Sequence, residues 1–223
     1  MKTSQRGLAE IAAHEGIVMS KYKDSVGVWT IGIGHTKNAG HPDPAKVKGE
    51  LPLDKIMEIF ACDIKKFERR VLNAFNSELS QSQFDAAVSF DFNTGGIHRA
   101  SWVKLFNQGH EQAARRSFMK WRKPREIIPR RQAECNLFFD GRYSSDGNVN
   151  VYRATSKGSV LWSSGNRVVL PNNEPAKNYH SPQQKPTVPN KPNTKNLVVI
   201  AAIICGVSVA FFDKIKRFFN RLG

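Results

Sequence analysis

Apolar residues recur at every third or fourth position through much of residues 1–143, which is the spacing of one face of an amphipathic helix. The longest run predicts a helix from about Leu53 to Phe75. That run consists of Met57, Phe60, Ile64, Phe67 and Val71. Shorter helices are expected from Thr3 or Ser4 to Glu15, after the capping-box pair Ser80 and Gln83, from Ser101 to Gly109, from there through Trp121, and from about Pro129 to Phe139.

Two stretches have the pattern of β-strands instead. Residues 17–36 contain short β-type runs that are broken by glycines. The segment VNVYRATSKGSVLW, followed by SSGNRVVL, predicts a hairpin after the helices. The fold class is therefore expected to be α+β, dominated by helices, with a small sheet near the N-terminus.

Residues 171–223 differ in composition from the rest of the chain. Residues 171–196 hold six prolines, six asparagines and four lysines, which is typical of a disordered, extended linker. Residues 197–212 carry no charge, and a basic tail follows them. A helix of that length is about 24 Å long, against a bilayer core of about 30 Å. The sequence thus predicts a membrane anchor at residues 197–223, with a buried core helix as the alternative.

These boundaries divide the chain into four parts. We expect a main domain at residues 1–143, an appended β-hairpin at 144–170, the linker at 171–196 and the hydrophobic helix at 197–223.

The charge narrows the choice of partners. Lys and Arg number 34 against 19 Asp and Glu, for a net charge of +15. This balance favours an anionic partner such as nucleic acid, phospholipid or an acidic polymer. No nucleic-acid-binding module is recognisable, so a nucleic-acid partner is not expected. The three cysteines are widely spaced and no Cys/His pairs have zinc-ligand spacing, so neither a disulfide framework nor a metal or other cofactor is expected.

Two acidic residues near the N-terminus are candidates for acid–base chemistry. Glu15 is expected at the C-terminal end of a helix, where the helix dipole disfavours its ionised form and raises its pKa. Asp24 opens the turn DSVG, and Thr30 lies on the next predicted strand. Two carboxylates in contrasting environments are what cleavage of a glycosidic bond requires. By itself this spacing is also common among unrelated surface carboxylates.

The surrounding residues add specificity. The stretch HEGIVMSKYKDSVGVWTIGIGHT closely resembles the catalytic segment of the phage-type lysozymes, or endolysins. The resemblance continues through SFDFNTGG, SWVKLFNQG and IIPRRQAE and covers roughly residues 4–142. It implies a two-lobed, mostly helical domain with a β-lobe beside the cleft. It also implies hydrolysis of the bond between N-acetylmuramic acid and N-acetylglucosamine in peptidoglycan.

The resemblance also implies roles for individual residues. Glu15 corresponds to the general acid of the family, Asp24 to the base and Thr30 to the hydroxyl that helps to place the water. Arg131 aligns with an arginine that pairs with the catalytic glutamate. Such a pair would lower the pKa of Glu15, so the sequence leaves open whether this effect or burial dominates.

Other aligned residues are expected at the substrate or between the lobes. Thr36, Phe92 and Ser101 align with positions that touch the sugar chain. Thr36 replaces an apolar residue of some relatives, Phe92 could instead be a core aromatic, and Ser101 could be a plain N-cap. His35 is interpreted as structural, because Asp63 aligns with an aspartate that pairs with this histidine.

Two alternative functions remain open from the sequence. A lytic transglycosylase needs the glutamate but not the pair that places water, and a non-catalytic protein could simply bind the wall. Retention of Asp24 and Thr30 favours the hydrolase.

No secretion signal is visible at the N-terminus. We expect a monomer at the bacterial inner membrane, with its catalytic domain acting on the periplasmic cell wall after synthesis in the host cytoplasm.

Overall fold

The computed structural model describes residues 1–170. Residues 171–223, on which the predicted linker and membrane anchor fall, lie outside the described part. Within residues 1–170 the α-helices are α1 (Gln5–Glu15), α2 (Leu53–Leu72), α3 (Gln81–Thr94), α4 (Ser101–Asn107), α5 (Glu111–Phe118) and α6 (Ile128–Asp140). Short 3₁₀ turns span Lys37–Ala39, Pro44–Lys46 and Arg125–Ile127. The strands are β1 (Ile17–Lys23), β2 (Trp29–Gly32), β3 (His35–Thr36), β4 (Asn148–Ala154) and β5 (Val160–Val169).

The helix ends follow the capping residues of the sequence. The Ser4 hydroxyl accepts from the Gly7 amide at the start of α1, and Ser80 with Gln83 forms the predicted capping box of α3. Gly141 ends α6 in the left-handed conformation, with φ +66°. The long helix α2 ends at Leu72, three residues before the predicted end at Phe75.

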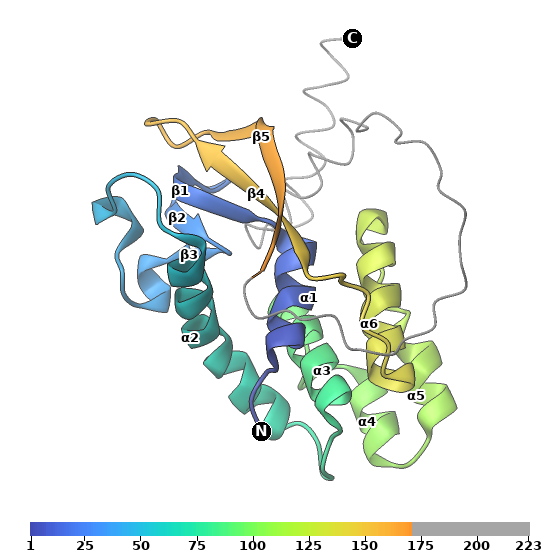
Figure 1. Ribbon diagram of the computed structural model, residues 1–223. Coiled ribbons are helices and arrows are strands. Elements are labelled where there is room, and N and C mark those ends of the chain that lie inside the picture. Colours follow the sequence, from blue (N-terminus) through green and yellow to red (C-terminus); the bar gives the residue numbers. More distant parts are fainter. Residues whose placement is uncertain (171–223) are drawn as a thin grey trace, which may run out of the picture.

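The strands form one five-stranded sheet in the order β3-β2-β1-β4-β5. The predicted C-terminal hairpin is present as β4 and β5, but it does not form a sheet of its own. Its first strand pairs in parallel with β1, while the other neighbouring strands are antiparallel. Figure 1 shows β4 beside β1 above the end of α1, so residues far apart in the sequence share this sheet.

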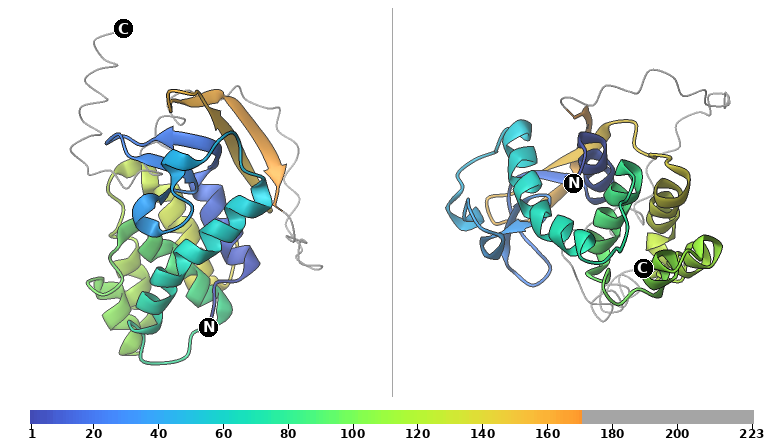
Figure 2. Two further views of the ribbon diagram at one scale, coloured as in Figure 1. Left: turned by 90° about the vertical axis from the view of Figure 1, so that its left-hand side faces the viewer. Right: turned by 90° about the horizontal axis from the view of Figure 1, so that it is seen from below.

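The helices and the sheet form two regions of the molecule. Figures 1 and 2 show the sheet at one end, α4 and α5 at the other, and α2 running from one region to the other. The fold is thus the expected mixture of a helical part and a small sheet.

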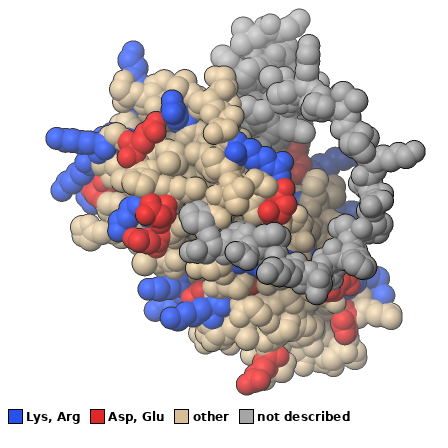
Figure 3. Space-filling model, viewed as in Figure 1, with Lys and Arg blue, Asp and Glu red and all other residues tan. Residues whose placement is uncertain are grey.

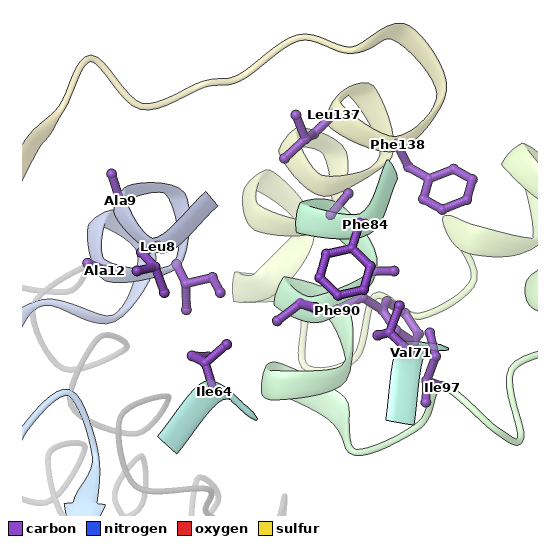
Figure 4. Close-up of a cluster of buried hydrophobic side chains, with 14 of the residues drawn as sticks. Leu8, Ala9, Ala12, Ile64, Val71, Phe84, Phe90, Ile97, Leu137 and Phe138 are labelled. Carbon is purple, nitrogen blue, oxygen red and sulfur yellow. The ribbon is translucent and has the colours of Figure 1, made fainter. Parts of the chain in front are cut away.

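The helical region is organised around α3. Phe84, Val88 and Phe90 on this helix are fully buried. Figure 4 shows buried side chains of α1, α2 and α6 on different sides of α3, and they belong to one hydrophobic cluster. A cluster of aromatic rings extends this core toward α4 and α5, with Trp102 packed 4.6 Å from Phe118 between ring centres. Burial of these rings is the main force that holds the helical region together.

Among the helices of residues 1–170, none combines the length and the apolar character that a membrane span needs.

Candidate active site

Glu15 lies where the first helix meets the sheet. It is the last residue of α1, and Gly16 ends the helix with a φ of +76°, a conformation that residues with a side chain rarely adopt. β1 starts directly afterwards at Ile17. The Glu15 side chain is almost completely buried, with 1% of the residue exposed. The helix end therefore places a carboxyl group inside the protein at the junction of the two regions.

The partner of Glu15 is Arg130 on α6. The Arg130 guanidinium donates through Nη1 to Glu15 Oε1, and through Nε to Glu134 Oε1 at 2.9 Å. Arg130 and the two glutamates that it contacts are all buried. Glu134 also accepts from the Ser89 hydroxyl at 2.7 Å. One buried arginine thus joins two buried glutamates.

Arg131, which the resemblance assigned to this role, does not pair with Glu15. Its guanidinium donates instead to Glu134, to the Asn93 side chain at 2.6 Å and to the Trp121 carbonyl at 2.9 Å. Successive residues on a helix point about 100° apart. Arg130 therefore faces α1, while Arg131 faces α3 and the Trp121 loop. The predicted pairing is wrong by one residue.

The two glutamates that contact Arg130 differ in their acidity. Burial raises the pKa of Glu15 above its usual value, and the charge and hydrogen bond of Arg130 oppose this only in part. For Glu134, burial alone would raise the pKa, but the charges of Arg131 and Arg130 outweigh it and lower the pKa. The sequence left open which effect dominates at Glu15, and in the structure it is burial. Neighbouring carboxyls with opposite pKa shifts are typical of acid–base sites.

Asp24 stands in the tight turn between β1 and β2. Its Oδ1 accepts from the amides of Val26 at 3.0 Å and Val28 at 2.8 Å. Thr30 donates its hydroxyl to the Val28 carbonyl at 3.1 Å, so Asp24 and Thr30 are tied to the same residue. Within residues 1–170 no group hydrogen-bonds the second carboxylate oxygen, Oδ2. That oxygen is available to accept from water.

Thr36 is the cross-strand neighbour of Thr30. The β2–β3 pairing places Thr30 opposite Thr36 and Ile31 opposite His35. Directly opposed residues project from the same face of a sheet. Thr30 is buried and Thr36 is half-buried, so Thr36 is the more exposed of the two side chains.

His35 links the sheet to α2, as the sequence predicted. Its Nδ1 lies 2.8 Å from Asp63 Oδ2, and its Nε2 lies 2.9 Å from the Pro42 carbonyl oxygen. Both partners are acceptors, and only the protonated ring can donate from both nitrogens, so this site favours the imidazolium form. Burial alone would lower the pKa of His35, but the hydrogen bonds to Asp63 and Pro42 outweigh it and raise the pKa.

Replacing His35 by asparagine is expected to destabilise the protein in a pH-dependent way. The pKa of His35 is higher in the folded than in the unfolded chain. The stabilisation is therefore fully present below about pH 6.5 and is lost as the pH rises through the raised folded pKa. We expect a loss of about 2 kcal/mol at about pH 6, from a buried charge-assisted pair. Urea unfolding of both proteins at a series of pH values measures it.

The Lys55–Glu58 pair provides the control, because it lies on α2, the helix that also carries Asp63. This pair is exposed to solvent on α2. Glu58→Gln should leave the pH dependence of unfolding unchanged. If His35→Asn and the wild type unfold at the same urea concentration throughout, the His35–Asp63 pair does not stabilise the fold.

The two remaining predicted substrate residues lie in the helical region. Phe92 on α3 is half-buried and packs edge-on against Phe67 at 5.1 Å and Phe60 at 5.7 Å between ring centres. Ser101 is exposed, and its hydroxyl lies 2.8 Å from that of Ser117. The alternative of Ser101 as an N-cap is wrong, because Ala100 occupies that position and Ser101 is the first residue of α4.

Sequence reasoning missed Arg130 and Glu134. The spacing of four residues in PRRQAE places both on one helix face, which could have indicated a buried ion pair. No group of three or more His, Cys, Asp or Glu side chains within residues 1–170 could hold a metal ion.

Several known proteins match a large part of this chain. The profile of the phage lysozyme family matches residues 12–134. The endolysin of Salmonella phage P22 is 31% identical over 146 residues, which is 62% of this chain and 98% of that protein. The endolysin of Bacillus phage B103 is 32% identical over 166 residues, or 70% of this chain and 59% of that protein.

A solved structure has a similar fold over about two thirds of the chain. An endolysin from Escherichia coli O157:H7 phage FAHEc1 superposes with a TM-score of 0.59 at 25% identity, covering 65% of this chain and 98% of that one. The described chain therefore spans nearly all of the P22 and FAHEc1 proteins, but only 59% of the B103 protein.

Proposed function

The chain belongs to the phage lysozyme family, and from that premise we propose that it is a muramidase of the endolysin type. The proposed reaction is hydrolysis of the β-1,4 bond between N-acetylmuramic acid and N-acetylglucosamine in peptidoglycan, leading to lysis of the bacterial cell. The observation that supports this best is the buried carboxyl of Glu15 on Arg130, with a raised pKa. A general acid needs to keep its proton near neutral pH.

In the proposed mechanism Glu15 protonates the glycosidic oxygen as the bond to the sugar breaks. Positive charge develops on the sugar ring at the same time. Asp24 accepts a proton from the attacking water through Oδ2, and Thr30 helps to orient that water. The turn that fixes Asp24 Oδ1 to two amides also fixes the direction of Oδ2.

Arg130 is proposed to stabilise Glu15 after it has given up its proton. The new carboxylate would otherwise be an unpaired buried charge, which is costly. Before that step, the low pKa of Glu134 keeps Arg130 paired and so leaves the proton on Glu15. Arg130 is thus paired with Glu134 while Glu15 is protonated, and it stabilises the Glu15 carboxylate once the proton has been transferred.

Contacts with the sugar chain remain proposals for Thr36, Phe92 and Ser101. Thr36 has the most direct support, because it lies opposite Thr30 in the sheet. Phe92 is held between two rings of α2, so its substrate contact would involve only its exposed edge.

The test of the proposed function is release of soluble fragments from purified peptidoglycan by the whole chain. A hydrolase releases fragments with reducing ends, and Asp24→Asn should then be severely impaired. Fragments with anhydro ends, together with full activity of Asp24→Asn, would indicate the lytic transglycosylase instead. If the protein sediments with the peptidoglycan but releases no soluble fragments, it is a wall-binding protein.

We also propose that residues 197–223 hold the protein at the bacterial inner membrane, with the catalytic domain on the wall side. The support is the uncharged stretch with basic flanks in the sequence. Basic side chains lie over both the sheet and the helices on the face shown in Figure 3, with acidic ones among them, and the excess of Lys and Arg over the whole sequence suits an anionic wall polymer. We propose a monomer that does not bind nucleic acid.

A protein ending at Leu170 is expected to be soluble and to hydrolyse purified peptidoglycan as fast as the whole chain. Leu170 completes the fold, since its side chain is buried and its amide donates to the Gly147 carbonyl at 2.9 Å. The whole chain should stay in the membrane pellet after alkaline carbonate extraction. Its appearance in the supernatant would contradict an inserted anchor and indicate a peripheral one.

A further inference from the structure

The β4–β5 hairpin lies outside residues 12–134, the part of the chain that matches the family profile. It nevertheless contacts residues next to each of the three proposed catalytic residues, namely Gly16, Lys23 and Trp29. We propose that this hairpin is a positioning element of the active site, in which Tyr152 and Gly158 hold the segments that carry Glu15, Asp24 and Thr30. The inference rests on the proposed function.

Tyr152 covers the backbone beside Glu15. It pairs with Val18 in the parallel β1–β4 ladder, and only 5% of it is exposed. A Cβ atom added to Gly16 would lie 3.1 Å from Tyr152 Cε2, and one added to Gly165 would lie 2.9 Å from Cε1. The ring is therefore held between two glycines, one of which directly follows Glu15. A larger residue at either position would displace the ring.

Gly158 holds the turn that carries Asp24. Its carbonyl accepts from the Lys23 amide at 2.8 Å, one residue before Asp24. A Cβ atom on Gly158 would lie 2.8 Å from Trp29 Cζ3, one residue before Thr30, and 3.1 Å from the Lys23 amide nitrogen. The tip of the hairpin thus packs against both ends of the β1–β2 turn.

The hairpin is itself anchored to the elements that it supports. On α1, Glu10 accepts from the Ser144 hydroxyl at 2.7 Å and from the Ser145 amide at 2.6 Å, both in the segment that leads into β4. On β1, the Ser20 hydroxyl accepts from the Ala154 amide at 3.0 Å. Displacement of the hairpin would therefore be transmitted to both α1 and β1.

The position of β1 in the sheet explains why such support affects the chemistry. With β4 present, β1 is the central strand, bonded on both sides (Figure 1). β1 connects Glu15 at one end to Asp24 at the other. A strand that is paired on both sides fixes the separation of the acid from the base, and small errors in such a separation are costly for catalysis.

The test compares two glycine-to-alanine variants of the whole chain. Gly158 and Gly109 both have positive φ, at +91° and +77°, so both alanines carry backbone strain. Only the alanine at 158 meets other atoms, because nothing lies within 4 Å of a Cβ at 109. On purified peptidoglycan, Gly158→Ala should have a kcat about 10-fold below that of Gly109→Ala. Its KM should stay within about twofold.

A second pair of variants covers the case in which Gly158→Ala does not fold. Tyr152→Phe keeps the ring and should retain the wild-type kcat, whereas Tyr152→Leu should lose kcat with little change in KM. Thermal unfolding sets an assay temperature at which every variant is folded. A merely structural hairpin would then leave kcat per folded molecule unchanged.

The possible outcomes separate the inference from the function on which it rests. Folded Gly158→Ala and Tyr152→Leu proteins with wild-type kcat would overturn the positioning role while the wild type remains a hydrolase. A rise in KM alone would overturn it too, because that would indicate substrate binding. If the wild type releases nothing, the proposed function fails and the inference fails with it.

Discussion

Replacing Glu15 by glutamine is expected to lower the rate of peptidoglycan hydrolysis about 1,000-fold. Glutamine has nearly the same shape and still offers an oxygen to Arg130, but it has no proton to give to the leaving sugar oxygen. The change removes a buried carboxyl whose pKa is already raised. The fold should therefore survive, and the loss should appear in kcat. Fragment release from purified peptidoglycan, combined with a circular dichroism spectrum, measures both.

Glu68→Gln is the matched control for this experiment. Glu68 is a half-buried glutamate on α2 that accepts from the Thr3 amide at 2.7 Å, with no link to Arg130. Its variant should keep wild-type activity. If Glu15→Gln keeps more than a few per cent of the activity, Glu15 is not the general acid.

Replacing Arg130 by methionine is expected to have the largest effect on stability. It leaves the carboxyls of Glu15 and Glu134 buried without their shared partner. Breaking a buried ion pair from one side costs about 3–5 kcal/mol. Urea unfolding measures this cost. Arg115→Met is the control, because Arg115 pairs with Asp140 at the surface and its loss should cost less than about 1 kcal/mol.

The pH profile of Arg130→Met distinguishes Arg130 from Arg131. Arg130 lowers the pKa of Glu15, so its removal lets that pKa rise further. A general acid must be protonated to work, so activity falls as the pH rises through its pKa. The alkaline limb of the profile should therefore move to higher pH in Arg130→Met. In Arg131→Met it should stay in place, and a shift there instead would reverse the assignment.

Local signals in the sequence were sufficient for most of the helices. The capping box at Ser80, the left-handed Gly141 and the apolar spacing along α2 each depend on nearby residues, and the structure has all three. The likeness to the family also predicted the contact between His35 and Asp63, which are 28 residues apart.

What the sequence did not predict depends on three-dimensional packing. Whether Arg130 or Arg131 faces Glu15 depends on how α6 is rotated against α1. A shift of one residue in an alignment exchanges the two arginines. The hairpin at residues 148–169 was recognisable from its own pattern. Its pairing with β1 was not, because a parallel neighbour more than 130 residues away leaves no local signal.

The proposed mechanism is tested most directly by hydrolysis of purified peptidoglycan in water enriched in ¹⁸O, with the fragments reduced at once and weighed by mass spectrometry. The mechanism predicts one heavy oxygen at each new reducing end, because Asp24 and Thr30 direct water to the sugar. With Glu15→Gln the mechanism predicts no labelled fragments above background, because the variant lacks the acid that breaks the bond. Anhydro ends without heavy oxygen, or labelled fragments released equally by Glu15→Gln, would contradict it.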